Sequence, residues 1–160
     1  MQKITVLCVG KLKERFYQEA AAEYVKRLGR HCKLDVVELP ESRLPEDPSP
    51  GEIQRALAAE AAAIREKLPR GGAVIALCIE GKQISSEELA QFLADRAGSG
   101  AGDVAFVIGS SHGLADEVKR AAALKFSMGR IPLPHQLARL VLTEQIYRAC
   151  TINAGMKYHK

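Results

Sequence analysis

Short apolar runs alternate with longer amphipathic segments along this chain. The apolar runs, most of them rich in β-branched residues, predict five strands: Lys3–Val9, Lys33–Leu39, Ala73–Ile79, Asp103–Ile108 and the shorter Leu124–Ser127. Apolar residues at helical intervals predict the intervening helices: Lys11–Leu28, Glu52–Leu68, Ser85–Ala97, one from about Ala115, and Gln136–Ala149. Strands that alternate with helices indicate an α/β fold, with a mostly parallel sheet and helices on both of its faces.

A stiff bend separates the last strand from the last helix. Gly129 permits unusual backbone angles, while Pro132 and Pro134 fix φ and lack an N–H donor. Such a loop presents its backbone groups to something other than a sheet. In parallel sheets, ligands bind beyond the carboxyl ends of the strands. We therefore expect Glu80-Gly81, Gly109–Gly113 and Ser127–Pro134 to form the walls of one site.

The final helix is apolar on two flanks, whereas a surface helix has a single apolar stripe. One flank holds Leu137, Leu140 and Val141, and the other holds Leu142, Ile146 and Ala149. This pattern favours a helix that packs on its own sheet and also on a second copy of the chain. The alternative is a central helix of a monomer.

Length and composition indicate one domain, residues 1–160, that is able to bury a continuous core. No apolar run approaches the roughly 20 residues that span a bilayer, and Met1–Gly10 does not resemble a signal peptide. We therefore expect a cytoplasmic protein without membrane association. The four cysteines and four histidines lack metal-ligand spacing, which predicts that no metal is bound.

Positive charge is concentrated near the C-terminus. Glu144 is the single acidic residue from Lys119 onward, against eight basic ones: Lys119, Arg120, Lys125, Arg130, Arg139, Arg148, Lys157 and Lys160. The region that holds the stiff bend is thus also the cationic region. A polyanionic partner such as nucleic acid would suit it, and a solvated basic surface is the alternative.

The segment Gly109–Gly113 matches Gly-x-Ser-x-Gly between a strand and a helix, as in serine hydrolases. A small hydrolase with Ser111 as nucleophile and His135 or His159 as base is therefore one alternative function. His135 follows Pro134 at a helix start, where we expect it to cap the helix instead. Neither a dinucleotide-binding fingerprint nor a P-loop is present in the sequence.

Several segments resemble the ribosomal RNA large subunit methyltransferase H family, which belongs to the SPOUT class. They are Ile4–Lys11, Ile108–Leu114, the Pro134-His135-Gln136 step, the helix from Arg139 to Arg148, and Tyr158-His159-Lys160. The similarity covers essentially the whole chain, and its C-terminal block is the specific part. Ser110 stands where the family pattern leads us to expect a second glycine.

The resemblance implies a SPOUT-like sheet with a C-terminal trefoil knot and a homodimer whose active site lies at the interface. The implied reaction transfers a methyl group from S-adenosyl-L-methionine to N3 of a pseudouridine in 23S ribosomal RNA (rRNA) of the assembled ribosome. By position, the residues near the target base would be Arg148, Tyr158 and His159. Those in contact with the methyl donor would be Leu77, Gly109, Met128, Gly129, Arg130, Ile131, Pro132 and Leu133.

The residues themselves are compatible with these roles. Methyl transfer depends strongly on positioning. The imidazole of His159 could accept the proton of the attacking nitrogen, Arg148 could stabilise the developing anion, and Tyr158 could stack on the base. A non-catalytic RNA-binding protein that uses the cationic C-terminal region is the remaining alternative.

Overall fold

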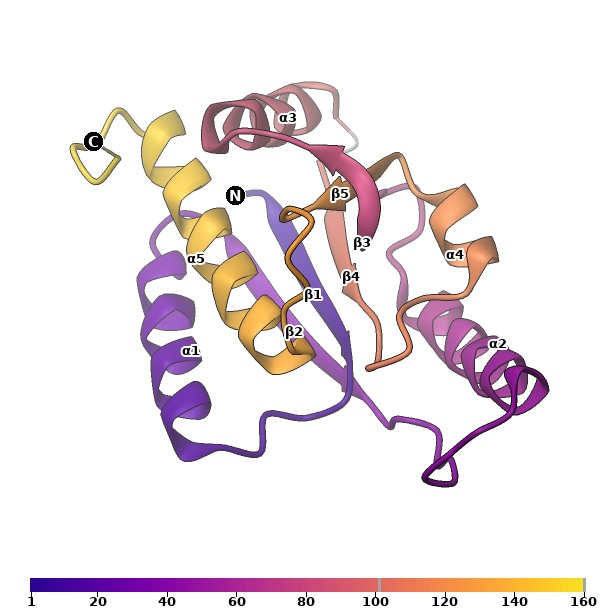
Figure 1. Cartoon of the computed structure of the whole chain (residues 1–160). Helices are drawn as coiled ribbons and strands as arrows, with labels where there is room; N and C mark the ends of the chain where they lie inside the picture. The colour runs from indigo at the N-terminus through magenta and orange to yellow at the C-terminus, as the bar shows by residue number, and fades with distance from the viewer. Residues whose placement is uncertain (101, 160) are drawn as a thin grey trace.

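The computed structural model describes residues 1–100 and 102–159. Lys160, which was counted in the basic region and in the family resemblance, lies outside the described residues. Within them the chain forms a five-stranded parallel sheet in the order β2-β1-β4-β3-β5 (Figure 1). The strands are β1 (Lys3–Val9), β2 (Lys33–Leu39), β3 (Ala73–Gln83), β4 (Val104–Ile108) and β5 (Leu124–Ser127). The helices are α1 (Arg15–Leu28), α2 (Pro50–Lys67), α3 (Ser86–Gly98), α4 (Asp116–Ala121) and α5 (His135–Asn153).

Helices cover both faces of the sheet, as predicted. Residues of α1, α3 and α5 pack with alternate residues of β1 and β4, including the fully buried Ile4 and Phe106, in one apolar cluster. Residues of α2 and α4 pack with Leu7 and Val107 in a second cluster on the opposite face. Because neighbouring residues of a strand point to opposite faces, continuous apolar runs such as Val104–Ile108 serve both clusters.

Local sequence signals explain most helix boundaries. Ser49 and Ser85 each accept a hydrogen bond from the backbone three residues later, and Glu52 and Glu88 complete the two capping boxes. The cap at Ser49 places Pro50 in the first turn of α2, two residues earlier than the predicted start. The first helix begins only at Arg15, so the predicted start at Lys11 is wrong.

The predicted end of the third strand at Ile79 is also wrong, because β3 continues to Gln83 through an irregularity. Phe126 of β5 pairs with both Leu77 and Lys82, and the residues between these two bulge out of the ladder. Gly81 permits this return: a Cβ atom there would lie 2.7 Å from the backbone of Lys125. The bulge turns Cys78–Glu80 toward the space beyond the carboxyl ends of the strands.

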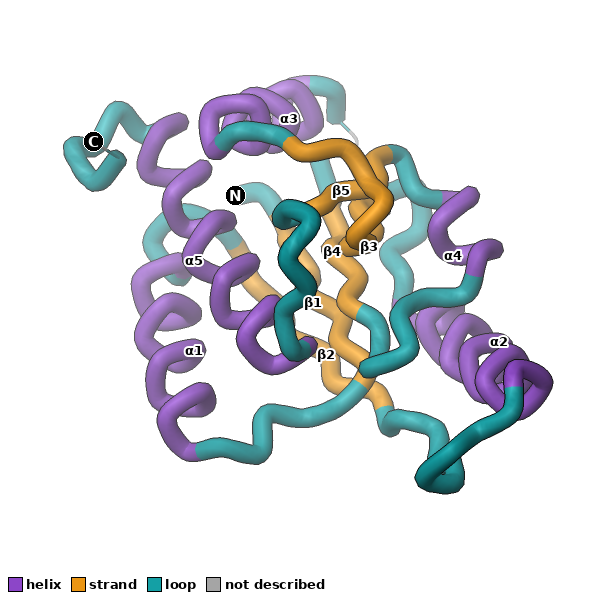
Figure 2. The backbone as a smooth tube through the Cα atoms, in the orientation of Figure 1, coloured by secondary structure: helices purple, strands orange, loops and turns teal. Residues whose placement is uncertain are grey.

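After β5, the chain crosses in front of the sheet to reach α5, which packs between α1 and α3 (Figure 2). This crossing segment, Met128–Pro134, is the stiff bend of the sequence. Among the helices of the described residues, none is long and apolar enough to span a membrane.

Candidate functional site

A pocket of about 390 Å³ opens beyond the carboxyl ends of β3, β4 and β5. Its walls are the β3 bulge, the turn after β4 and the crossing segment, which are the three walls that the sequence predicts. Seven of the eight predicted cofactor-binding residues line it: Leu77, Gly109, Met128, Gly129, Ile131, Pro132 and Leu133. The exception is Arg130, which is exposed and is not among the lining residues.

The turn after β4 is closely packed. Gly113 donates a backbone hydrogen bond of 2.9 Å to the Ser110 carbonyl, and a Cβ atom on Gly109 would lie 2.2 Å from the Gly113 carbonyl oxygen. Only glycine fits at position 109. Ser110 has no positive φ, so its side chain is accommodated where we expected a second glycine.

The arrangement around Ser111 does not favour hydrolysis. Its hydroxyl donates to Glu41 Oε1 at 3.1 Å rather than to a histidine. Glu41 belongs to the proline-rich loop after β2, so this hydrogen bond ties the turn after β4 to that loop. We therefore assign Ser111 a structural role.

Two hydrogen bonds of Ser127 join the β3 bulge to the crossing segment. The Ser127 hydroxyl donates to the Ile79 carbonyl at 2.8 Å and accepts from the Gly129 N–H at 3.1 Å. Ser127 is only 3% exposed, so its hydroxyl depends on these two backbone partners. Gly129 itself has φ +124°, a backbone conformation that residues other than glycine rarely adopt.

An ion pair stands at the edge of the pocket. Lys119 Nζ of α4 lies 2.6 Å from Glu80 Oε1 in the β3 bulge. The hydrogen bond from Lys119 holds the pKa of the Glu80 carboxyl below its ordinary value. This contact ties the β3 bulge to α4.

His135 also lines the pocket. Pro134, not His135, occupies the N-cap position of α5, so the expectation that His135 caps this helix is wrong. The His135 ring lies beside Gly10 at the end of β1, where a Cβ atom would come within 3.3 Å of its Nε2.

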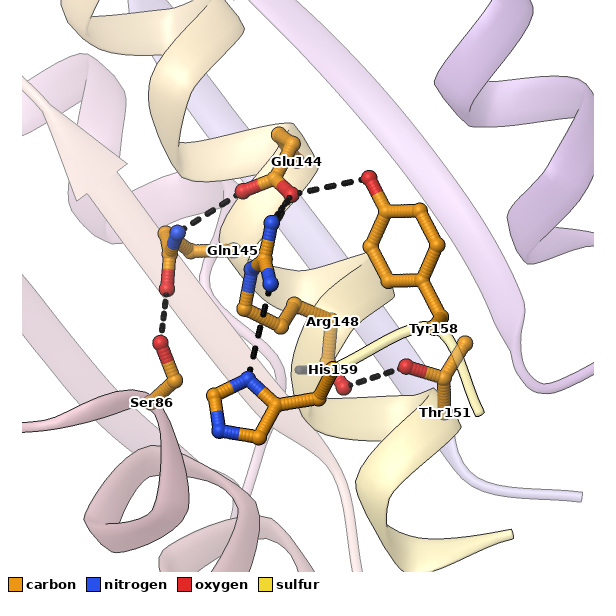
Figure 3. A network of polar contacts seen from close by, with 7 residues as sticks. All are labelled: Ser86, Glu144, Gln145, Arg148, Thr151, Tyr158 and His159. Carbon is orange, nitrogen blue, oxygen red and sulfur yellow. Dashed lines mark hydrogen bonds and ion pairs between the residues drawn. The ribbon is translucent and has the colours of Figure 1, made fainter. Parts of the chain in front are cut away.

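The three residues predicted to lie near the target base form one polar network at the other end of α5 (Figure 3). Glu144 Oε1 accepts from Arg148 Nη2 at 2.6 Å and from the Tyr158 hydroxyl at 3.0 Å. His159 Nδ1 lies 3.4 Å from Arg148 Nη1, and its Nε2 lies 2.6 Å from Glu87 Oε1. A neutral imidazole with its proton on Nε2 satisfies both contacts and leaves Nδ1 as the acceptor.

These contacts set the protonation of the network. The hydrogen bond to Glu144 raises the pKa of Arg148, so the guanidinium stays charged. Burial raises the pKa of Tyr158 to about 12, and its hydrogen bond to Glu144 acts in the same direction. The guanidinium of Arg148 also lies over the Tyr158 ring, 4.9 Å from its centroid.

The pocket and the network lie far apart within one chain. The pocket lining on α5 extends to Ala138, and Arg148 follows that residue by ten positions on the same helix, which corresponds to a rise of about 15 Å. One chain therefore does not bring its predicted cofactor-binding residues and its predicted target-base residues together.

Sequence reasoning missed the roles of two acidic residues of the network, Glu144 and Glu87. Glu144 was noted only as the single acidic residue of the basic C-terminal region, although it holds Arg148 and Tyr158. Its spacing of four residues before Arg148 on a helix was the available signal. The contact of Glu87 with His159 spans 72 residues, and no local pattern could have indicated it.

A search for relatives places the chain in a family. The family model described as "Predicted SPOUT methyltransferase" matches residues 2–159. The chain belongs to the SPOUT methyltransferase family. The expected resemblance to ribosomal RNA large subunit methyltransferase H is confirmed, since proteins of that name match over nearly their full length. The protein from Streptococcus equi subsp. zooepidemicus is 48% identical over 99% of both chains. The protein from Ligilactobacillus salivarius is 49% identical over 98% of this chain and 99% of its own.

Two solved structures share the fold of this chain. A probable methyltransferase from Bordetella pertussis superposes with a TM-score of 0.58 at 16% identity, covering 93% of this chain and 94% of that one. A probable methylase family protein from Haemophilus influenzae has a TM-score of 0.53 at 17% identity, covering 98% of this chain and 70% of that one.

Proposed function

We propose that this protein transfers a methyl group from S-adenosyl-L-methionine to N3 of a pseudouridine in 23S rRNA of the assembled ribosome. The identity of about half, over almost the entire length, to proteins named ribosomal RNA large subunit methyltransferase H carries this proposal. We place the activity in the cytoplasm, where its proposed substrate is found. The concentration of basic residues in the C-terminal region suits an RNA substrate.

The pocket has the size and lining that the methyl donor needs. A volume of about 390 Å³ lies in the range typical of small-molecule sites. Leu77, Met128 and Leu133 offer apolar walls for a flat aromatic ring. When bound, S-adenosyl-L-methionine would supply a sulfonium methyl group to the reaction.

The residues of the network would prepare the attacking nitrogen. N3 of the base lies between two carbonyl groups and must lose its proton. A charged Arg148 close to these carbonyls would stabilise the anion that results, and the Tyr158 ring beside it would orient the base. His159 Nδ1, which accepts in the neutral ring, is the group available to take up the proton once it separates from Arg148.

The separation of pocket and network supports a homodimer. Leu137, Leu140 and Val141 are half-buried and lie on the same face of α5 as Glu144 and Arg148. Two copies of α5 packed antiparallel on this face would bring the Arg148 end of one chain to the His135 end of its partner. Each active site would then take its pocket from one chain and its network from the other.

We also propose the trefoil knot. The crossing segment Met128–Pro134 runs from the edge strand β5 to α5 and shares one pocket with the β3 bulge and the turn after β4. A chain end threaded through a loop would be enclosed in this way. Mechanical stretching tests the proposal, because a tightened knot keeps the fully extended chain shorter than the roughly 3.6 Å per residue of an unknotted one.

The decisive experiment supplies ribosomes from cells that lack this gene with purified protein and labelled S-adenosyl-L-methionine. We expect label to enter 23S rRNA, and nucleoside mass spectrometry to show it in a methylated pseudouridine. A lack of label in the RNA, with protein that binds S-adenosylhomocysteine, would contradict the proposal.

A further inference from the structure

A second pocket of about 250 Å³ lies between the end of α1 and the middle of α5, away from the cofactor pocket. We call it the α1 basic pocket. Its lining holds the three cations Lys26, Arg27 and Arg30, together with Glu23, His31, Tyr147 and Met156. Neither the proposed methyl donor site nor the target-base network uses these residues.

The charges of the α1 basic pocket are not balanced within the chain. Glu23 is its single acidic residue and pairs with Arg27, whose Nε lies 2.9 Å from Glu23 Oε1. Lys26 and Arg30 are exposed, and no carboxylate of the described residues forms an ion pair with either of them. Cations that converge on one hollow without a carboxylate partner favour an anion there.

The floor of the α1 basic pocket continues into the target-base network through aromatic contacts. The Arg27 guanidinium lies 5.8 Å from the centroid of the Tyr147 ring. Tyr147 meets Tyr158 edge-on, with ring centroids 4.8 Å apart. The Arg148 guanidinium lies over the Tyr158 ring, 4.9 Å from its centroid. The α1 basic pocket is therefore next to the place where the target base would be held.

We propose that the α1 basic pocket binds a phosphate group of the RNA strand that carries the target base. This inference rests on the proposed function, because it uses the position of the target-base network. A planar guanidinium such as that of Arg30 matches phosphate oxygens, and the ammonium of Lys26 adds a second charge. Tyr147 is only 9% exposed and is covered by neighbouring rings, so the pocket offers a charged rim rather than a stacking platform.

Lys26 and Arg30 would thus be positioning residues. Contacts to phosphate fix the register of a nucleic acid but carry no sequence information. Held by its backbone at the end of α1, the strand would present a neighbouring base to Arg148 and Tyr158. Loss of this phosphate contact should weaken substrate binding and leave the chemical step intact once the substrate is bound.

The test compares two charge-reversed double variants. The first carries Lys26→Glu and Arg30→Glu. The matched control carries Lys67→Glu and Arg70→Glu, which are also exposed, also lie at the end of a helix, and stand on the opposite face of the sheet. Methyl transfer to ribosomes is measured at several salt concentrations, with calorimetric binding of S-adenosylhomocysteine as the check on folding.

We expect the first variant to raise KM for ribosomes at least about tenfold, with kcat within about twofold of the unsubstituted protein. The dependence of log KM on log salt concentration should become shallower by about one unit, as for a lost phosphate contact. The control variant should change KM and the salt slope less than the first variant does. Both variants should bind S-adenosylhomocysteine with the affinity of the unsubstituted protein.

Equal KM values and salt slopes for the two variants would overturn the phosphate site and leave the proposed function standing. If the unsubstituted protein transfers no methyl group, the proposed function fails instead. Direct binding of 23S rRNA to the same three proteins then decides the phosphate site, which predicts weaker and less salt-dependent binding for the first variant only.

Discussion

The hydroxyl group of Ser127 donates a hydrogen bond to the carbonyl of Ile79 across 2.8 Å. These residues are 48 positions apart and belong to two different walls of the cofactor pocket. The same oxygen accepts from Gly129, so a single buried side chain holds the β3 bulge against the bend. The sequence analysis placed Ser127 at the start of one wall but did not predict that its side chain joins two of them.

Replacing Ser127 with alanine should loosen the pocket. The substitution removes the shared partner of the Ile79 carbonyl and the Gly129 N–H, and a hydrogen bond contributes about 0.5–1.5 kcal/mol. We expect the affinity for S-adenosylhomocysteine to fall about tenfold, measured by calorimetry. Ser99→Ala is the control, since its hydroxyl makes an exposed bond to the Arg96 carbonyl. Equal affinities of the two variants would refute the assignment.

Replacing Arg148 with alanine should affect chemistry rather than cofactor binding. Loss of the cation beside the target base should lower kcat about 10²–10³-fold. The affinity for S-adenosylhomocysteine should stay unchanged, because Arg148 is not among the residues that line the pocket. Arg120→Ala, which removes an exposed cation from α4, serves as the control and should retain activity. A lowered cofactor affinity in Arg148→Ala would contradict the assignment of Arg148 to the target base.

Mixed dimers should reveal whether the active site is shared between two chains. Gly129→Val should abolish cofactor binding because valine does not adopt φ +124°. Neither Gly129→Val nor Arg148→Ala should be active alone. When the two are refolded together, random pairing should restore about one quarter of the normal activity, because each mixed dimer keeps one intact pocket opposite one intact network. A site contained in one chain would give no restoration.

Alkaline pH should destabilise the protein through Tyr158. Burial raises the pKa of this hydroxyl to about 12, whereas a tyrosine in an unfolded chain titrates near about 10. The folded state holds the proton more tightly, so the contribution to stability is complete below pH 10 and is lost as the pH rises toward 12. Urea unfolding from pH 9 to 12 should show a smaller loss in Tyr158→Phe than in Tyr17→Phe. Equal losses would argue against the buried hydrogen bond to Glu144.

Local patterns were sufficient to predict the strands, the helices and the three walls of the pocket. Apolar runs and capping residues depend on neighbours in the sequence, so they can be recognised without a structure. The β3 bulge could not be predicted in this way. Its cause is the close approach of Gly81 to the backbone of β5, and a strand that appears to end at a glycine gives no sign that it resumes.

The role of long-range polar contacts was equally hidden. Arg139 was counted among the basic residues of the C-terminal region, and it forms an ion pair of 2.6 Å with Glu38 of β2. Similarly, the Lys13 N–H bonds the Gln136 side chain at 2.8 Å, which ties the loop before α1 to the start of α5. Pairings between residues more than a hundred positions apart follow from the topology, which composition and spacing do not encode.

The length of α5 has a consequence of its own. If two such helices bring a methyl donor and a base together, the number of residues between Ala138 and Arg148 sets the distance between the two sites. One inserted residue there would turn every later side chain by about 100° and shift it by about 1.5 Å. The spacing of this helix would then be under tighter constraint than the identity of most residues along it.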